Sequence, residues 1–81
     1  MRTFLLKRLR RKAKAKFYIR AKSVLPSGVN YIVYKNEPFI DEFLGLFWDK
    51  DIATKELGRY RREYIEEQIE LIRFRIQNNN I

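Results

Sequence analysis

The sequence contains no cysteine and no histidine among its 81 residues. These absences exclude disulfide bonds within the chain, thiolate or imidazole ligands for zinc, and the side chain that most often acts as a general base. The three glycines, Gly28, Gly45 and Gly58, are too scattered to form a phosphate-binding loop. A serine nucleophile needs a positioned base, and no lysine motif supplies one. We therefore predict a protein that is not an enzyme and needs no cofactor.

Carboxylates are the remaining candidates for chemistry. Asp49 and Asp51, with help from Glu42, have the oxygen ligands that magnesium prefers. Two acids two positions apart beside the start of a helix are more often helix caps. We therefore predict a cap at this point of the chain and no metal site.

Long apolar runs are also missing. No stretch approaches the roughly 18 consecutive apolar residues that a membrane helix needs. The N-terminus does not have the form of a secretory signal, because its apolar run is only Phe4-Leu5-Leu6 and the charges follow it. An arginine-rich, acid-free start is also typical of a mitochondrial transit peptide, an alternative that we rank lower. We expect a protein of a virion or of the cytoplasm, neither secreted nor transmembrane.

Acidic residues are absent from the first 22 positions, and this makes the charge uneven. Ten of the 18 Lys and Arg residues lie there, whereas the other 59 positions hold eight bases against ten acids. The formal charge of +8 therefore belongs to the N-terminal end. Such asymmetry points to an anionic partner, which is a nucleic acid, an acidic protein surface or an anionic membrane.

The residues that we expect to contact this anion follow one another closely. Lysines and arginines would neutralise phosphates in a salt-sensitive, largely sequence-independent way, and a tyrosine with an arginine nearby would stack on exposed bases. The alternative is that the tyrosine packs on the sheet and the arm only aids solubility. The predicted contact residues are Lys7, Arg8, Arg10, Arg11, Lys12, Lys14, Lys16, Tyr18, Arg20 and Lys22.

The content of 46% hydrophobic and 15% aromatic residues predicts a folded chain. A domain this small hides only about 60% of the surface of its unfolded chain, so we expect a thin core. We divide the chain into residues 1–16, a basic arm or amphipathic helix, and residues 17–81, a single small domain. In the helical alternative, Leu5, Leu6, Leu9 and Ala13 share one side.

Residues 17–50 have the pattern of a small antiparallel sheet. Residues 17–24 alternate apolar and polar side chains, and residues 29–35 are rich in β-branched and aromatic types. The segment between them, Leu25-Pro26-Ser27-Gly28, has the residues of a tight turn, so we predict a hairpin. Residues 36–50 fit either a helix or a third strand with Gly45 inside it, and we prefer the strand.

The last third of the chain, residues 51–77, has the apolar spacing of one long helix, which we expect Asp51 to cap. Its apolar residues form two stripes, the second about a third of a turn further round than the first. A short domain covers one stripe, so we expect the far end to contact another molecule. The first stripe is Ala53, Leu57, Tyr60 and Tyr64, and the second is Ile65, Ile69, Ile72 and Ile76. The predicted partner interface consists of Trp48, Leu71, Ile72, Phe74 and Ile76.

Part of this pattern resembles a known family. A hairpin, a strand ending in Leu44-Gly45-Leu46-Phe47, a capping acid and a helix with an early alanine at Ala53 resemble integrase arm-binding and plant AP2-type DNA-binding domains. The resemblance covers about residues 17–64 and implies a three-stranded sheet with a helix. It also implies that one sheet face, here with Tyr18, Arg20 and Lys22, enters a DNA groove. Unlike that family, this chain has few basic residues on its second and third strands.

These features predict an α+β fold and a binding function. We expect a small basic accessory or structural subunit of a large nucleoprotein assembly, in a phage virion rather than a ribosome because no resemblance to a ribosomal protein is visible. Its long C-terminal helix would bind a partner protein, and its N-terminal arm an anionic surface or nucleic acid. One alternative is a free-standing DNA-binding regulator that uses the sheet face and the basic arm. A membrane-surface peptide formed by residues 4–16 is a third and less favoured alternative.

Overall fold

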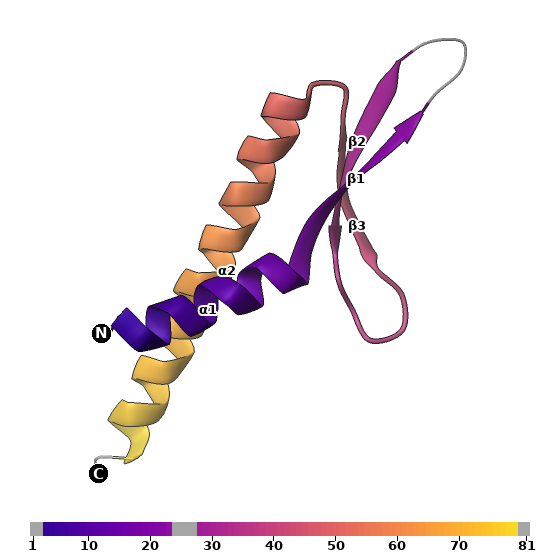
Figure 1. The fold of residues 1–81 in the computed structure, drawn as a ribbon. Helices are drawn as coiled ribbons and strands as arrows, with labels where there is room; N and C mark the ends of the chain where they lie inside the picture. Colours follow the sequence, from indigo (N-terminus) through magenta and orange to yellow (C-terminus); the bar gives the residue numbers. More distant parts are fainter. Residues whose placement is uncertain (1–2, 24–27, 80–81) are drawn as a thin grey trace.

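The computed structural model describes residues 3–23 and 28–79. Its elements follow the chain as α1 (Thr3–Lys16), β1 (Phe17–Ser23), β2 (Val29–Lys35), β3 (Glu42–Phe47) and α2 (Lys50–Asn79). Figure 1 shows both helices on one side of a three-stranded sheet. The predicted α+β fold, with an N-terminal helix, a small antiparallel sheet and a long C-terminal helix, is confirmed.

The sheet is antiparallel with the order β1-β2-β3. Tyr18 pairs with Tyr34, and Tyr34 in turn pairs with Phe43, beside a register shift that interrupts the pairing of β2 with β3. Residues 42–47 are therefore the third strand that we preferred over a helix. Of the predicted turn, residues 25–27 lie outside the described part of the chain. Gly28 has a φ of 122°, which suits glycine because it has no Cβ.

One face of the sheet packs against α2. Phe17, Val33 and Leu57 form the buried core cluster, and Tyr60 and Tyr64 of α2 pack against it. The Phe17 ring stacks on Tyr60 and meets Tyr64 edge-on, with ring centroids 6.1 and 5.9 Å apart. The first apolar stripe of the long helix therefore faces the sheet.

The cap of α2 is one acid earlier than the sequence suggested. Asp49 Oδ1 accepts hydrogen bonds from the backbone N–H groups of Asp51 at 2.7 Å and of Ile52 at 3.4 Å. Asp51 was therefore the wrong choice of cap, since it already lies in the first turn of α2. The physical reason is that the capping side chain must reach forward to N–H groups two or three residues on, and Asp49 is the acid placed to do so.

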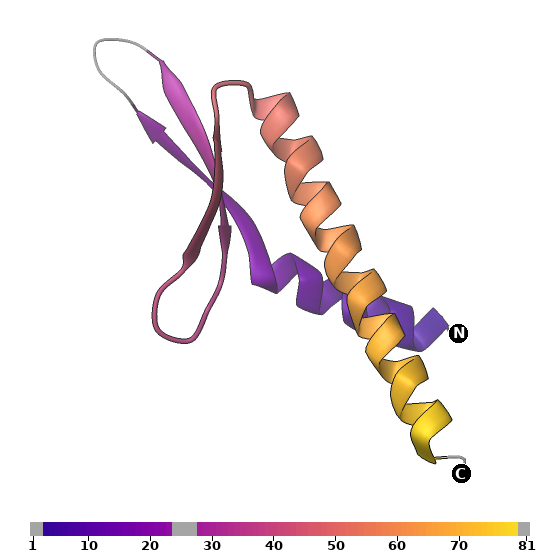
Figure 2. The ribbon, with the colours of Figure 1, turned by 180° about the vertical axis from the view of Figure 1, so that it is seen from behind.

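The N-terminal segment is a helix that packs on the rest of the chain. Leu9 and Ala13 are buried, and Ala13 lies against α2 beside Gly58 and Ile65. The start of the second apolar stripe is thus covered by α1 of the same chain, which the sequence reasoning did not foresee. The view from behind in Figure 2 also shows α1 crossing α2 away from the sheet.

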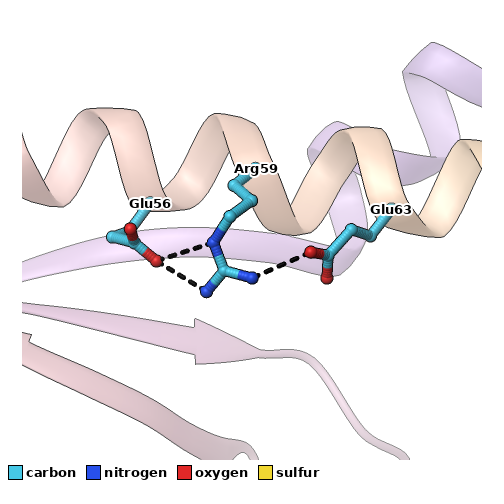
Figure 3. A network of polar contacts seen from close by, with 3 residues as sticks. All are labelled: Glu56, Arg59 and Glu63. Atoms are coloured by element: carbon cyan, nitrogen blue, oxygen red, sulfur yellow. Dashed lines mark hydrogen bonds and ion pairs between the residues drawn. The ribbon is translucent and has the colours of Figure 1, made fainter.

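Polar pairs on α2 are confined to its solvent-facing side. Arg59 donates to Glu56 from Nε at 2.9 Å and to Glu63 from Nη1 at 2.8 Å, as Figure 3 shows. Hydrogen bonds to Glu56 and then Glu63 raise the pKa of Arg59 above its ordinary value. Solvent screens exposed pairs of this kind, so each contributes little to stability. They support the helix and mark no site.

The molecule is elongated, with extents of 62 × 27 × 15 Å. Its radius of gyration is 16.2 Å, whereas a compact domain of this length has about 12 Å. The far half of α2 extends beyond the sheet (Figure 1). Much of the chain's surface is therefore available to other molecules.

Candidate nucleic-acid and partner interfaces

The helix α1 carries most of the predicted anion-contact residues, and they are accessible. Leu9 and Ala13 turn towards the protein, so the basic side chains occupy the other sides of the helix. Within residues 3–23 and 28–79, the ion pairs are Lys35–Glu37, Arg59–Glu56, Arg59–Glu63 and Arg73–Glu70, and none involves α1. Lys16 is half-buried, and the exposed ones are Lys7, Arg8, Arg10, Arg11, Lys12 and Lys14.

These cations divide between two sides of α1. Phe4, Lys7, Arg8 and Arg11 line an open depression of about 230 Å³ on the side away from α2. Arg10 and Lys14 instead face a groove of about 310 Å³ between α1 and α2. Arg61 and Arg62 of α2 line the same groove. The fold thus brings two arginines of the long helix next to the basic helix.

Arg61 has a structural role at this point. Its Nη2 donates to the backbone carbonyls of Phe17 at 2.7 Å and of Lys14 at 3.4 Å. Burial lowers the pKa of Arg61, and its Nε is buried without a partner among the described residues. The side chain therefore holds the junction of α1 and β1 against α2.

The remaining predicted contact residues lie on the sheet face opposite α2. Arg20 and Lys22 are exposed there, and Tyr18 is half-buried. The Tyr18 ring stacks on Tyr34 with centroids 5.4 Å apart, and the Arg20 guanidinium lies 5.8 and 5.6 Å from the two centroids. This is a cation–π arrangement on a face that no helix covers. Tyr18 therefore packs on the sheet, and its ring lies beside the exposed guanidinium of Arg20.

Tyr18 also has a polar partner. Its hydroxyl donates a hydrogen bond to Asp41 Oδ2, in the segment before β3. The hydrogen bond to Asp41 raises the pKa of Tyr18, and desolvation acts in the same direction. Tyr18 is therefore held in one orientation on the sheet and stays a neutral donor.

Large apolar side chains are exposed at both ends of the molecule. Trp48, directly after β3, is 68% exposed, and the segment leading into β3 exposes Phe39 completely. At the other end, α2 exposes Phe74 by 61%. Of the predicted partner residues, Leu71, Phe74, Ile76 and Trp48 are exposed and Ile72 is half-buried. The fold does not bring Trp48 together with the other four, since they lie at opposite ends of α2.

The acids considered as metal ligands do not gather into a site. In residues 3–23 and 28–79 there is no group of three acidic, histidine or cysteine side chains with a metal-binding arrangement. Asp49 is occupied by the cap of α2. In the same part of the chain, neither helix has the length and apolar character to cross a membrane.

Comparison with known proteins adds no relative. No family model, no curated protein and no solved structure matches the chain. The three-stranded sheet followed by a helix agrees with the fold that the resemblance to DNA-binding domains implies, but the resemblance rests on its few residues alone. The functional argument therefore depends on charge, exposure and geometry.

The sequence analysis did not include Arg61 and Arg62 among the predicted contact residues. Arg61 and Arg62 belong to a helix face with mixed charges, and nothing in their spacing relates them to Arg10 or Lys14. Their proximity depends on how α1 docks on α2. The one available signal was the second apolar stripe, which requires a covering element on that side of the long helix.

Proposed function

We propose that the chain is a non-enzymatic subunit of a nucleoprotein assembly. In this role, the basic surface of α1 contacts nucleic acid, and the exposed apolar side chains contact a partner protein. We favour a phage virion over a ribosome, because the sequence shows no resemblance to a ribosomal protein.

The exposure of large apolar side chains supports the contact with a partner protein. Among the described residues, seven apolar side chains are buried, whereas eleven large ones are exposed. Scattered exposed apolar residues are normal, but contiguous groups mark interaction surfaces. Here they group around β3 and on the last turns of α2, which supports two docking surfaces on one elongated subunit.

The cations of α1 support the nucleic-acid part of the proposal, since none of them forms an ion pair within residues 3–23 and 28–79. Like charges three and four positions apart repel along a helix, and bound anions relieve the repulsion. Phosphate contacts of this type give binding that falls steeply with salt and does not depend on sequence.

Fluorescence anisotropy with a labelled DNA duplex tests this half. The intact chain is compared with a variant in which Lys7, Arg8 and Arg11 are changed to Gln. The matched control removes three exposed charges of α2, those of Lys50, Lys55 and Arg75. We expect the α1 variant to bind at least tenfold more weakly and with a smaller salt dependence, and the control to bind nearly as the parent does. Equal losses in both variants would reject a specific role of α1.

A free-standing DNA-binding regulator is the second candidate. It is favoured by the uncovered sheet face with Tyr18, Arg20 and Tyr34. Such a regulator distinguishes one duplex sequence from another, and Arg20→Gln reduces that discrimination. An assembly subunit binds unrelated duplexes equally, and Arg20→Gln leaves their ratio unchanged.

A further inference from the structure

The groove between α1 and α2 concentrates positive charge from two distant parts of the chain. Arg10 and Lys14 approach it from α1, and Arg61 and Arg62 from α2. No acidic residue lines it. Among the described residues, none of the four takes part in an ion pair. Four cations thus share one open groove of about 310 Å³ without a counter-charge.

This arrangement is costly unless an anion is present. Like charges that line one groove repel one another, and a bound anion relieves the repulsion. The folded chain could spread these side chains into solvent, yet Arg61 is fixed in place by the carbonyls of Phe17 and Lys14. The most direct relief is a bound group that carries negative charge and accepts several hydrogen bonds.

The shape of the groove also suits a small anion. Gly58 lines it, and a Cβ there would meet only Arg62 Nη1, at 3.4 Å. The groove is therefore open at this residue. Arg10, Lys14 and Arg62 are exposed at its rim, so their side chains can converge on a ligand. Arginine is well suited to the task because its planar group donates two parallel hydrogen bonds to phosphate.

We propose that this groove binds a backbone phosphate of nucleic acid, held jointly by Arg10 and Lys14 of α1 and Arg62 of α2, with Arg61 as its fixed inner wall. The inference rests on the proposed function, in which α1 contacts nucleic acid, and adds a defined site that includes α2. Anionic lipid is the alternative source of a phosphate group, and binding to vesicles distinguishes it from nucleic acid.

The test compares two exposed arginines of the same helix. Arg62→Gln removes a charge from the groove, and Arg75→Gln removes one from the far end of α2. Binding of the intact chain to a labelled DNA duplex is measured over a series of salt concentrations, and circular dichroism verifies the fold of each variant. We expect Arg62→Gln to weaken binding about fivefold to tenfold. We also expect the plot of log K against log salt to become less steep by about 0.9, the value for one phosphate contact. Arg75→Gln should leave both quantities nearly unchanged.

A double variant tests whether the two helices hold the same phosphate. Lys14→Gln and Arg62→Gln should be non-additive, since the second change removes less once the shared ligand is already weakened. Strictly additive losses of binding free energy, or equal effects of Arg62→Gln and Arg75→Gln, would contradict a phosphate site in the groove. Neither result would contradict the proposed function. A parent chain that does not bind the duplex at all would instead reject the proposed function. Binding to vesicles with anionic lipids but not to DNA would overturn the groove in favour of a membrane surface.

Discussion

The Arg61 side chain of α2 donates a hydrogen bond from Nη2 to the backbone carbonyl of Phe17, 2.7 Å away. Phe17 is the first residue of β1 and follows α1 without a loop. The carbonyls at the end of a helix have no partners within it, and Arg61 Nη2 also donates to one of them, that of Lys14, at 3.4 Å. The backbone N–H of Asn36 donates to a second, that of Lys16, at 2.6 Å. Helix, strand and long helix are thereby joined at one point.

Removal of the Arg61 hydrogen bonds should destabilise the fold where α1 meets β1 and α2. We expect Arg61→Ala to lower the free energy of unfolding by about 1–2 kcal/mol, because the hydrogen bonds of a charged donor to two backbone carbonyls are lost. Arg62→Ala is the matched control, since the Arg62 side chain is next in sequence, is exposed and makes no such bond within the described residues. Urea unfolding followed by circular dichroism measures both. Equal stabilities of the two variants would show that the Arg61 bonds contribute nothing.

Gly45 leaves space for the ring of Phe47, which lies two residues further along β3. A Cβ at this position would lie 3.0 Å from two ring atoms of Phe47, which itself packs against the core. We expect Gly45→Ala to destabilise the fold by about 1–3 kcal/mol, the usual range for overpacking. Thermal unfolding is the measurement. If the substitution leaves the midpoint unchanged, the Phe47 ring has room to move aside.

Gly58 should behave in the opposite way. It lies inside α2, where glycine costs about 0.5–1 kcal/mol relative to alanine, and a Cβ there has only ordinary contact with Arg62. We therefore expect Gly58→Ala to raise the free energy of unfolding by up to about that amount. The same unfolding experiment applies. A loss of stability would mean that α1 approaches α2 more closely at this residue than the structure indicates.

The bond between Tyr18 and Asp41 makes one contribution to stability dependent on pH. The pKa of Tyr18 is raised in the folded chain above its ordinary value of 10.0. Its contribution is therefore complete below pH 10 and is lost as the pH rises through the folded-state pKa, because the unfolded chain releases the proton first. Phenolate absorbance during an alkaline titration should show one late-titrating tyrosine that disappears in Tyr18→Phe. In Asp41→Asn the Tyr18 pKa should return towards 10; an unchanged titration would exclude Asp41 as the cause.

The sequence predicts the order of elements because that order depends on local patterns. Alternation in residues 17–24, the turn residues and the helical spacing of Ala53, Leu57 and Tyr60 each act over a few positions, and the structure follows them. Leu71, Phe74 and Ile76 at the far end of α2 are exposed, whereas Ile65 at the start of the second stripe lies beside Ala13 of α1. That contact joins residues about fifty positions apart and depends on the direction in which α1 leaves β1. No local pattern records such a direction.

The candidate site was predictable to the same extent. The charge asymmetry indicated an exposed basic segment, since a run without acids has no internal partners, and in the structure these residues lie on α1. The groove was not predictable, because Arg61 and Arg62 lie in a stretch that contains both acidic and basic side chains. Only the crossing of the two helices separates these arginines from their acidic neighbours and turns them towards Arg10 and Lys14.

The measurement that tests the central claim most directly is sedimentation velocity of the intact chain, alone and with either of two unrelated DNA duplexes, at low and high salt. We expect the chain to sediment with both duplexes equally at low salt and to be released at high salt, because salt weakens phosphate contacts. A chain that leaves both duplexes free at low salt would contradict a contact of α1 with nucleic acid.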